Sequence, residues 1–102
     1  MSYFEVSISR EVTRMTALRD TYERQLSELP KGSLRTKERN GKRYHYLSYR
    51  RDGKVVSEYV GIDEAIINDL RNRLERRKGI ESLLKRIRKE LVLMNKALEV
   101  SR

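Results

Sequence analysis

The N-terminal segment has apolar residues at helical spacing. Every seventh position is apolar over four repeats: Ile8, Met15, Tyr22 and Leu29. This spacing places one apolar seam along a helix, as in coiled coils. Ser2, followed by Glu5 three residues later, predicts a capping box at the start. Pro30 disfavours helical geometry in the residue before it, so the pattern predicts a helix over residues 1–29.

The next segment changes to a strand pattern. Two turn signals, Asn40-Gly41 and Asp52-Gly53, divide residues 33–60 into three short runs. Asn-Gly and Asp-Gly favour two-residue hairpin turns, because both residues tolerate positive φ. The middle run, Tyr44–Tyr49, is rich in residues that favour strands. We therefore predict a three-stranded antiparallel meander over residues 33–60.

The last segment returns to helical spacing. Asp63 is a good N-cap, and two apolar seams follow it. Their members are Ile66, Leu70 and Leu74, then Ile80, Leu84, Ile87, Leu91, Met94 and Leu98. Arg77 stands where a seam residue should be apolar, and Gly79 costs about 1 kcal/mol relative to Ala in a helix interior. The pattern predicts a helix over residues 63–100, with a kink or a break near residues 76–79.

These elements define an α+β fold in which a long helix, a three-stranded meander and a second long helix follow one another. A chain of 102 residues is expected to form a single domain, residues 1–102. The simplest packing joins the two helices as an antiparallel, coiled-coil-like pair. The second helix is the longer one, and its seam extends beyond what the first can cover. A homodimer through the C-terminal helix is therefore predicted.

The two turns decide which side chains share a face of the predicted sheet, because side chains alternate along a strand. One face, called the tyrosine face below, is aromatic and basic: Arg35, Lys37, Tyr44, Tyr46, Ser48, Arg50, Ser57 and Tyr59. The other, called the inner face, is mostly apolar: Leu34, Leu47, Tyr49, Val56 and Val60, with Thr36 and His45. The inner face is expected to pack on the helices, and the tyrosine face is expected to meet solvent.

The net charge of +9 favours a polyanionic partner, and nucleic acid is the first choice. Residues 31–61 hold nine Lys/Arg and three Asp/Glu, a net charge of +6, whereas residues 1–30 have a net charge of −1. Tyrosine rings can stack on bases, cations neutralise phosphates, and a β-ribbon fits a DNA major groove. The candidate binding residues are Arg35, Lys37, Lys42, Tyr44, Tyr46, Arg50, Lys54 and Tyr59, with Arg76 and Arg77 on the second helix.

Both groups of candidates also have a purely structural interpretation. Cross-strand tyrosine pairs stabilise a sheet, and a cation over a ring adds to this without any ligand. A run of charges on a helix is commonly a solvated face. The sequence alone leaves these alternatives open.

The sequence indicates no catalytic chemistry. There is no cysteine, and the single His45 cannot build a multi-histidine metal site. Asp63, Glu64 and Asp69 fit capping and helix-dipole compensation better than magnesium binding. We expect a protein that is not an enzyme and has neither cofactor nor metal. No apolar run approaches the ~18 residues of a membrane span, and the start does not resemble a signal peptide, so a cytoplasmic protein is expected.

Three stretches carry a resemblance to other proteins: Leu29–Leu34, Asn40–Arg50 and Gly53–Gly61. They resemble a group of small bacterial and phage proteins of unassigned function, with an N-terminal helix, a basic-aromatic meander and a charged coiled-coil helix. The resemblance implies the architecture above and no activity. A weaker likeness links the meander to the arm-binding domains of phage and transposon integrases, which bind DNA through a three-stranded sheet. This chain lacks a recombinase domain and adds an N-terminal helix.

Two functions follow as hypotheses. The first is a nucleic-acid-binding accessory protein of a phage or mobile element, with DNA and RNA both open as ligands. The second is a protein-binding module, either an inhibitor of a nucleic-acid-guided nuclease, as anti-CRISPR proteins are, or a coiled-coil adaptor.

Overall fold

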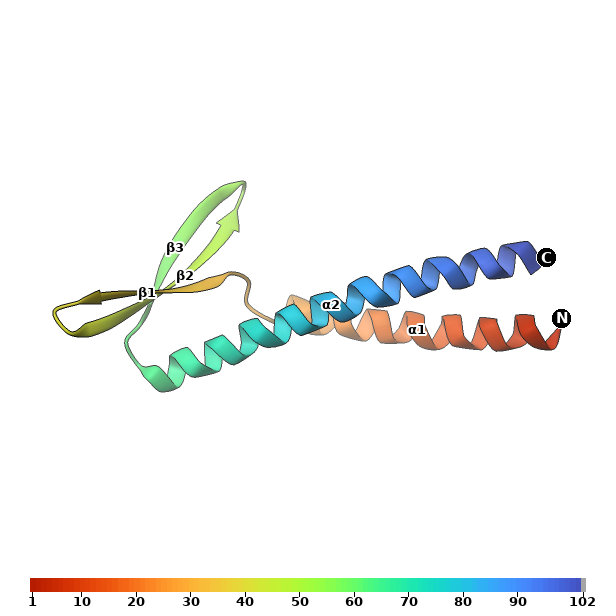
Figure 1. Cartoon of the computed structure of the whole chain (residues 1–102), viewed down its shortest axis with the longest axis horizontal. Helices are drawn as coiled ribbons and strands as arrows, with labels where there is room; N and C mark the ends of the chain where they lie inside the picture. The colour runs from red at the N-terminus through yellow and green to blue at the C-terminus, as the bar shows by residue number, and fades with distance from the viewer. Residues whose placement is uncertain (102) are drawn as a thin grey trace. The chain divides into compact units, whose positions relative to one another are not determined.

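The computed structural model describes residues 1–101, which form two helices and three strands (Figure 1). The elements are α1 (Tyr3–Ser27), β1 (Ser33–Arg39), β2 (Lys42–Arg51), β3 (Lys54–Gly61) and α2 (Glu64–Ser101). The predicted α+β order of helix, meander and helix is confirmed. Backbone proximity groups the chain into two compact units. The helical unit joins residues 1–28 to α2 from Gly79 onward, and the sheet unit is Leu29–Lys78.

Both helices begin at the caps that the sequence predicts. At α1, the Glu5 N–H donates to Ser2 Oγ at 3.1 Å, and the Ser2 hydroxyl donates to Glu5 Oε1 at 3.1 Å. At α2, the Ala65 N–H donates to Asp63 Oδ1 at 3.0 Å. Each cap supplies an acceptor to an N–H that has no partner within its helix. α1 ends at Ser27, two residues before the predicted boundary.

The helical unit is an antiparallel pair with its core along the seams. The start of α1 and the end of α2 lie at the same end of this pair (Figure 1). Met15 of α1 is buried with Ile87 and Leu91 of α2. Half-buried apolar residues pack around these three: Val12, Leu18, Tyr22 and Met94. Burying one such side chain contributes about 1.5–3 kcal/mol, so the seam supplies the main stabilisation of this unit.

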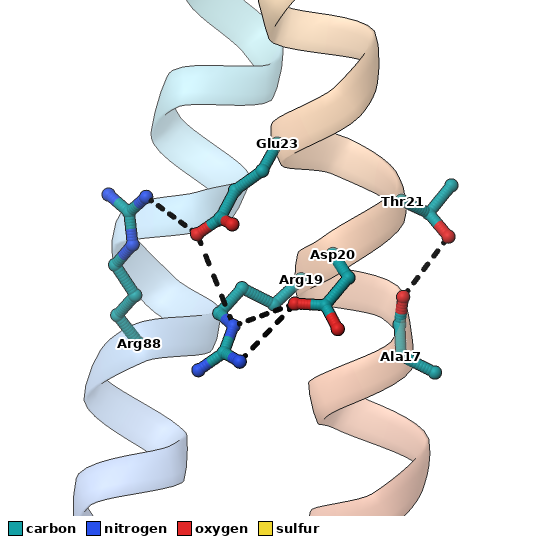
Figure 2. A network of polar contacts seen from close by, with 6 residues as sticks. All are labelled: Ala17, Arg19, Asp20, Thr21, Glu23 and Arg88. Atoms are coloured by element: carbon teal, nitrogen blue, oxygen red, sulfur yellow. Dashed lines mark hydrogen bonds and ion pairs between the residues drawn. The ribbon is translucent and has the colours of Figure 1, made fainter.

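A polar network crosses the surface of the same pair. Figure 2 shows Arg88 of α2 beside Glu23 of α1, where Arg88 Nη2 lies 3.1 Å from Glu23 Oε1. Arg19 lies 4.0 Å from the same Glu23 oxygen and 3.2 Å from Asp20 Oδ1. All four side chains are substantially exposed to solvent, where one such pair contributes at most about 1 kcal/mol. The network therefore adds little to the stability that the apolar seam provides.

The seam of α2 differs from the prediction in two places. Ile67 is fully buried and Ile66 is 59% exposed, so the seam begins one residue later than predicted. Starting at Ile67 continues the alternating three- and four-residue steps through Leu70 and Leu74, which starting at Ile66 does not. α2 also continues without a break through Gly79, because a cost of about 1 kcal/mol is small beside the packing on either side.

The seam residue Arg77 is half-buried and has a structural partner. Its Nη1 donates to the Leu29 carbonyl oxygen at 3.0 Å. This carbonyl lies just beyond the end of α1, where backbone oxygens lack helical N–H partners. A guanidinium at this seam position thus satisfies a backbone acceptor that an apolar side chain would leave without a donor.

The burial of the C-terminal seam bears on the predicted homodimer. Ile80, Leu84, Ile87 and Leu91 are buried within the single chain, and Met94 packs at the edge of the same core. The uncovered seam that motivated the prediction is therefore not present. A homodimer through α2 stays a prediction, and it would need another face of the helix.

The meander has the register that its two turns predict. β1 pairs with β2 and β2 with β3, both antiparallel, with Tyr46 opposite Arg35 on one side and Tyr59 on the other. All four turn residues have positive φ, from 51° at Asn40 to 78° at Gly53. This conformation matches the strand twist and is the reason that Asn-Gly and Asp-Gly suit such turns.

One irregularity interrupts the register near the end of β3. Tyr46 pairs with Tyr59, but the preceding residue, His45, pairs with Gly61 instead of Val60. Val60 is thus the extra residue of a bulge and has no cross-strand partner. Strict alternation along β3 predicts that Val60 lies opposite His45 on the inner face. In the structure, Gly61 takes this position. Gly61 has a φ of +111°, which a residue without Cβ adopts readily.

The buried residues of the sheet unit are His45 and Leu47 of β2, with Ile67 and Leu74 of α2. The two ring nitrogens of His45 lie 2.9 Å from Thr36 Oγ1 and 3.2 Å from Glu64 Oε1. The ring is 2% exposed, so these bonds satisfy a buried polar group and tie β1, β2 and the start of α2 together.

Gly32 packs closely against β2 just before the sheet begins. A Cβ at this position would lie 2.4 Å from the Ser48 carbonyl oxygen and 3.1 Å from Leu47 Cδ1. Its φ is +123°, in a region that favours glycine. The glycine allows the chain to enter β1 in contact with β2.

Candidate nucleic-acid interface

Three tyrosine rings gather on one face of the meander. The Tyr46 and Tyr59 ring centroids are 5.4 Å apart at an interplanar angle of 57°, and those of Tyr44 and Tyr59 are 6.4 Å apart at 41°. Tyr46 and Tyr59 are directly opposite across β2 and β3, and Tyr44 is the diagonal neighbour. Tyr44 and Tyr46 are half-buried, whereas Tyr59 is 53% exposed. The cluster therefore offers one accessible ring supported by two others.

A row of cations lies beside the rings on β1. Arg35, Lys37 and Arg39 are all exposed and alternate along the strand, so they point to the same face. Successive members are about 6.8 Å apart along an ideal strand. Lys37 Nζ lies 5.2 Å from the centroid of the Tyr46 ring. This cation–π contact joins the row of charges to the row of rings.

A surface hollow lies where the two rows meet. It has a volume of about 300 Å³ and is lined by Lys37, Arg39, Asn40, Tyr44 and Tyr46. Its lining combines cations, an amide and aromatic rings, which together can recognise a negatively charged aromatic ligand such as a nucleotide.

Comparison with protein families matches residues 11–71 to DUF6788, a domain of unknown function. The chain belongs to this family. The matched range includes most of α1, the whole meander and the first turns of α2. Comparisons with curated proteins and with solved structures found no match. The family description names no activity, so any function of this DUF6788 domain must be argued from its own geometry.

Sequence reasoning missed Arg39. Arg39 flanks the Asn40-Gly41 turn, and the register continues through the Arg39–Lys42 pair. Arg39 therefore shares the face of Lys37 and lines the hollow. Strict strand alternation from Lys37 would have found it.

The structure distributes the other predicted site residues of the DUF6788 domain over several places. Arg50 is exposed and shares the tyrosine face, opposite Val55. Lys42 lines a separate hollow of about 540 Å³ with Gly41, Arg43, Ile62 and Glu64. Lys54 pairs with Arg51, which by alternation lies on the inner-face side of the sheet.

The two candidate binding residues on the second helix differ in their exposure to solvent. Arg76 is exposed on α2, whereas Arg77 is half-buried and donates to the Leu29 carbonyl. Arg77 is therefore engaged in the fold, and the tyrosine face draws its cations from β1 and β2.

His45, Glu64, Asp63 and Asp69 all have structural partners. His45 is a packed histidine, and Asp63 caps α2, as the sequence predicts. Within residues 1–101, no group of three or more His, Asp and Glu side chains is placed to hold a metal ion. In the same part of the chain, neither helix is sufficiently long and apolar to cross a membrane.

An exposed ion pair on α1 changes the pKa of both of its members. Arg14 donates hydrogen bonds to Glu11, which lowers the pKa of the Glu11 carboxyl and raises the pKa of Arg14. This pair joins adjacent turns of one helix and lies outside the meander.

Proposed function

We propose that this DUF6788 domain is a non-enzymatic accessory protein that binds nucleic acid through the tyrosine face. The observation that supports this is the placement of a cation row and a ring cluster side by side on one exposed face. Cations suit phosphates, and rings suit the faces of bases or sugars. A phage or mobile-element source and a cytoplasmic location stay predictions.

The state of the charges on the two sides of β1 favours binding over a purely structural role. On the inner-face side, Arg43 lies 3.9 Å from Glu38, directly across the strand pair. On the tyrosine face, Arg35, Lys37 and Arg39 form no ion pair with an acidic side chain within residues 1–101. A cation–π contact explains Lys37 without a ligand, but it does not explain the two arginines beside it. Unneutralised cations in a row are what a polyanion binds.

The experiment is a salt-dependent binding measurement with fluorescently labelled oligonucleotides. The double variant Arg35→Ala/Lys37→Ala should bind more weakly than the parent. The slope of log K against log salt should fall in magnitude by about 1.5, since each lost phosphate contact removes about 0.7–0.9. The charge-matched control, Lys85→Ala/Arg86→Ala, removes two exposed cations from α2 and should retain most of the affinity.

Two results would contradict the proposal. One is a parent protein that binds no oligonucleotide at low salt. The other is a control variant that loses as much affinity as the tyrosine-face variant, because binding would then depend on total charge. A variant Arg76→Ala that abolishes binding would move the site to α2.

Protein binding is a second candidate, and a different surface supports it. A mostly apolar hollow of about 440 Å³ on α2 is lined by Arg88, Lys89, Val92 and Leu93, with both apolar residues exposed. Its charged lining is basic, because it comes from Arg88 and Lys89. A second copy of the chain would bring like charges together. An acidic amphipathic helix of a partner protein is the complementary occupant.

This second candidate covers the inhibitor and adaptor hypotheses, and it has its own test. The probe is a synthetic helical peptide with leucines along one face and glutamates elsewhere. It should bind the parent and lose binding to Leu93→Glu, while a lysine version of the peptide should not bind. Equal binding of both peptides would contradict this reading.

A further inference from the structure

On the tyrosine face, a row of cations lies along only one edge of the sheet. β1 carries Arg35, Lys37 and Arg39 on this face, whereas the opposite edge strand, β3, presents Val55, Ser57 and Tyr59. β2, between them, supplies Tyr44 and Tyr46 at the centre and has Lys42 and Arg50 near its two ends. At the level of the rings, the order across the sheet is therefore cations, rings and then an uncharged edge.

This order matches the cross-section of a single nucleic-acid strand. An unpaired strand has phosphates along one side and accessible base faces along the other. A duplex has its base faces covered by stacking and two phosphate backbones, one on each side of the groove that a sheet enters. A sheet in the major groove would meet phosphates beyond both of its edges, but this face has a row of cations beside only one.

We propose that the tyrosine face binds single-stranded nucleic acid, with the sugar–phosphate backbone along β1 and the bases on the tyrosine rings. This inference rests on the proposed function above and specifies its ligand. DNA and RNA share the chemistry used here, because every base has a face that can stack.

The rings have different parts in this arrangement. Lys37 lies over the Tyr46 ring at 5.2 Å, so this ring is already in a cation–π contact. Tyr59 is 53% exposed and leans on both other rings, so it is the most accessible platform for a base. The hollow of about 300 Å³ between the rows is suited to a neighbouring base, and Asn40 there has an amide that can both donate and accept hydrogen bonds.

Four labelled probes of equal length test the inference on the intact protein. They are an oligothymidine strand, an oligouridine strand, an abasic phosphodiester strand and a DNA duplex. Oligothymidine and oligouridine should each bind at least about tenfold more tightly than the duplex. The abasic strand should bind about tenfold more weakly than these two strands, because it keeps the phosphates and lacks the bases.

Variants at Tyr59 test which ring carries the stacking. Tyr59→Ala should reduce oligothymidine affinity about tenfold and should leave the affinity for the abasic strand unchanged, while Tyr59→Phe should retain the parent affinity. Circular dichroism of each variant checks that the fold persists. If Tyr59→Ala does not fold, the comparison of the four probes on the parent protein still tests whether single strands are preferred.

The outcomes separate the inference from the proposed function. Duplex binding as tight as single-strand binding, with loss in Arg35→Ala/Lys37→Ala, would leave the nucleic-acid function intact and overturn the single-strand inference. Equal affinity for the abasic strand and oligothymidine would overturn it as well, because the rings would then not contribute. Binding of no probe would overturn both. A preference of oligothymidine over oligouridine, or the reverse, would support the inference and identify the natural polymer.

Discussion

The two faces of the meander come from the same three strands and differ in how their polar groups are satisfied. On the inner face, His45 bonds to Thr36 and Glu64, and the exposed Arg43 lies beside Glu38. On the tyrosine face, the cations of β1 are exposed and have no acidic partner within residues 1–101. Alternation along a strand separates the two faces. The burial of His45 and Leu47 then distinguishes the side that maintains the fold from the side available to a ligand.

This contrast predicts that stability and binding can be changed separately. Substitutions on the inner face should unfold the sheet unit, and substitutions on the tyrosine face should leave it folded. The predictions below test this separation in order of decreasing effect.

The largest expected effect is that of Leu47→Ala on the inner face. Leu47 is buried on β2, and removing a buried leucine side chain costs about 2–5 kcal/mol. Urea denaturation measures the change in the free energy of unfolding. The control is Ser57→Ala on the tyrosine face, which is exposed and should change stability by less than about 0.5 kcal/mol. Comparable losses in the two variants would refute the division between the faces.

The next effect concerns the entry into the sheet. Gly32→Ala should destabilise the protein by about 2 kcal/mol or more, since a positive φ alone costs about 1–3 kcal/mol and the new Cβ would also clash with Ser48. Gly53→Ala is a matched control, because Gly53 has positive φ and open space around it. The melting temperature of Gly32→Ala should lie clearly below that of Gly53→Ala. Equal melting temperatures would mean that the close approach of Gly32 to β2 contributes nothing to stability.

A smaller effect is expected from Tyr46→Ala on the tyrosine face. The ring contacts Tyr59 and Lys37, and cross-strand pairs of this kind contribute about 0.2–1 kcal/mol each. The loss of stability should therefore stay near 1 kcal/mol, well below that of Leu47→Ala. Oligothymidine affinity should fall severalfold at every salt concentration, because stacking is insensitive to salt. A loss of stability with unchanged affinity would assign Tyr46 to the fold alone.

The smallest effect is expected in the helical unit. Arg88→Gln removes the charge that lies 3.1 Å from Glu23, and an exposed pair contributes about 0.2–1 kcal/mol. Chemical denaturation at low and high salt should show a small loss that salt reduces further. A loss above 2 kcal/mol would mean that this network, and not the apolar seam, determines the pairing of α1 with α2.

Much of the fold could be predicted because its signals are local. The positions of Asn40-Gly41 and Asp52-Gly53 determine both registers, and Ser2 and Asp63 mark the helix starts. What the sequence concealed depends on the rest of the chain. The burial of Ile67 instead of Ile66 is an exception, because the alternating three- and four-residue steps of the seam already favour Ile67. The bulge at Val60 arises where β3 ends at Gly61.

The candidate site was predicted in part, for a related reason. Alternation identified Arg35, Lys37 and the three tyrosines of the tyrosine face, and the structure brings their rings together. Arg39 was missed although the register continues to the turn, and Lys54 was included although it lies on the other side of the sheet. Strand alternation extended to each turn corrects both assignments. Arg77 could not be interpreted from the sequence, since its bond to the Leu29 carbonyl spans distant parts of the chain.

The most direct test of the central claim is an NMR titration of the ¹⁵N-labelled protein with oligothymidine. We predict that the largest amide shifts occur at Lys37, Arg39, Tyr44, Tyr46 and Tyr59. The amides of Lys54 on the other side of the sheet and of Arg76 on α2 should shift little. Shifts centred on α2, or equal shifts on both faces of the meander, would contradict the assignment of the tyrosine face as the binding surface.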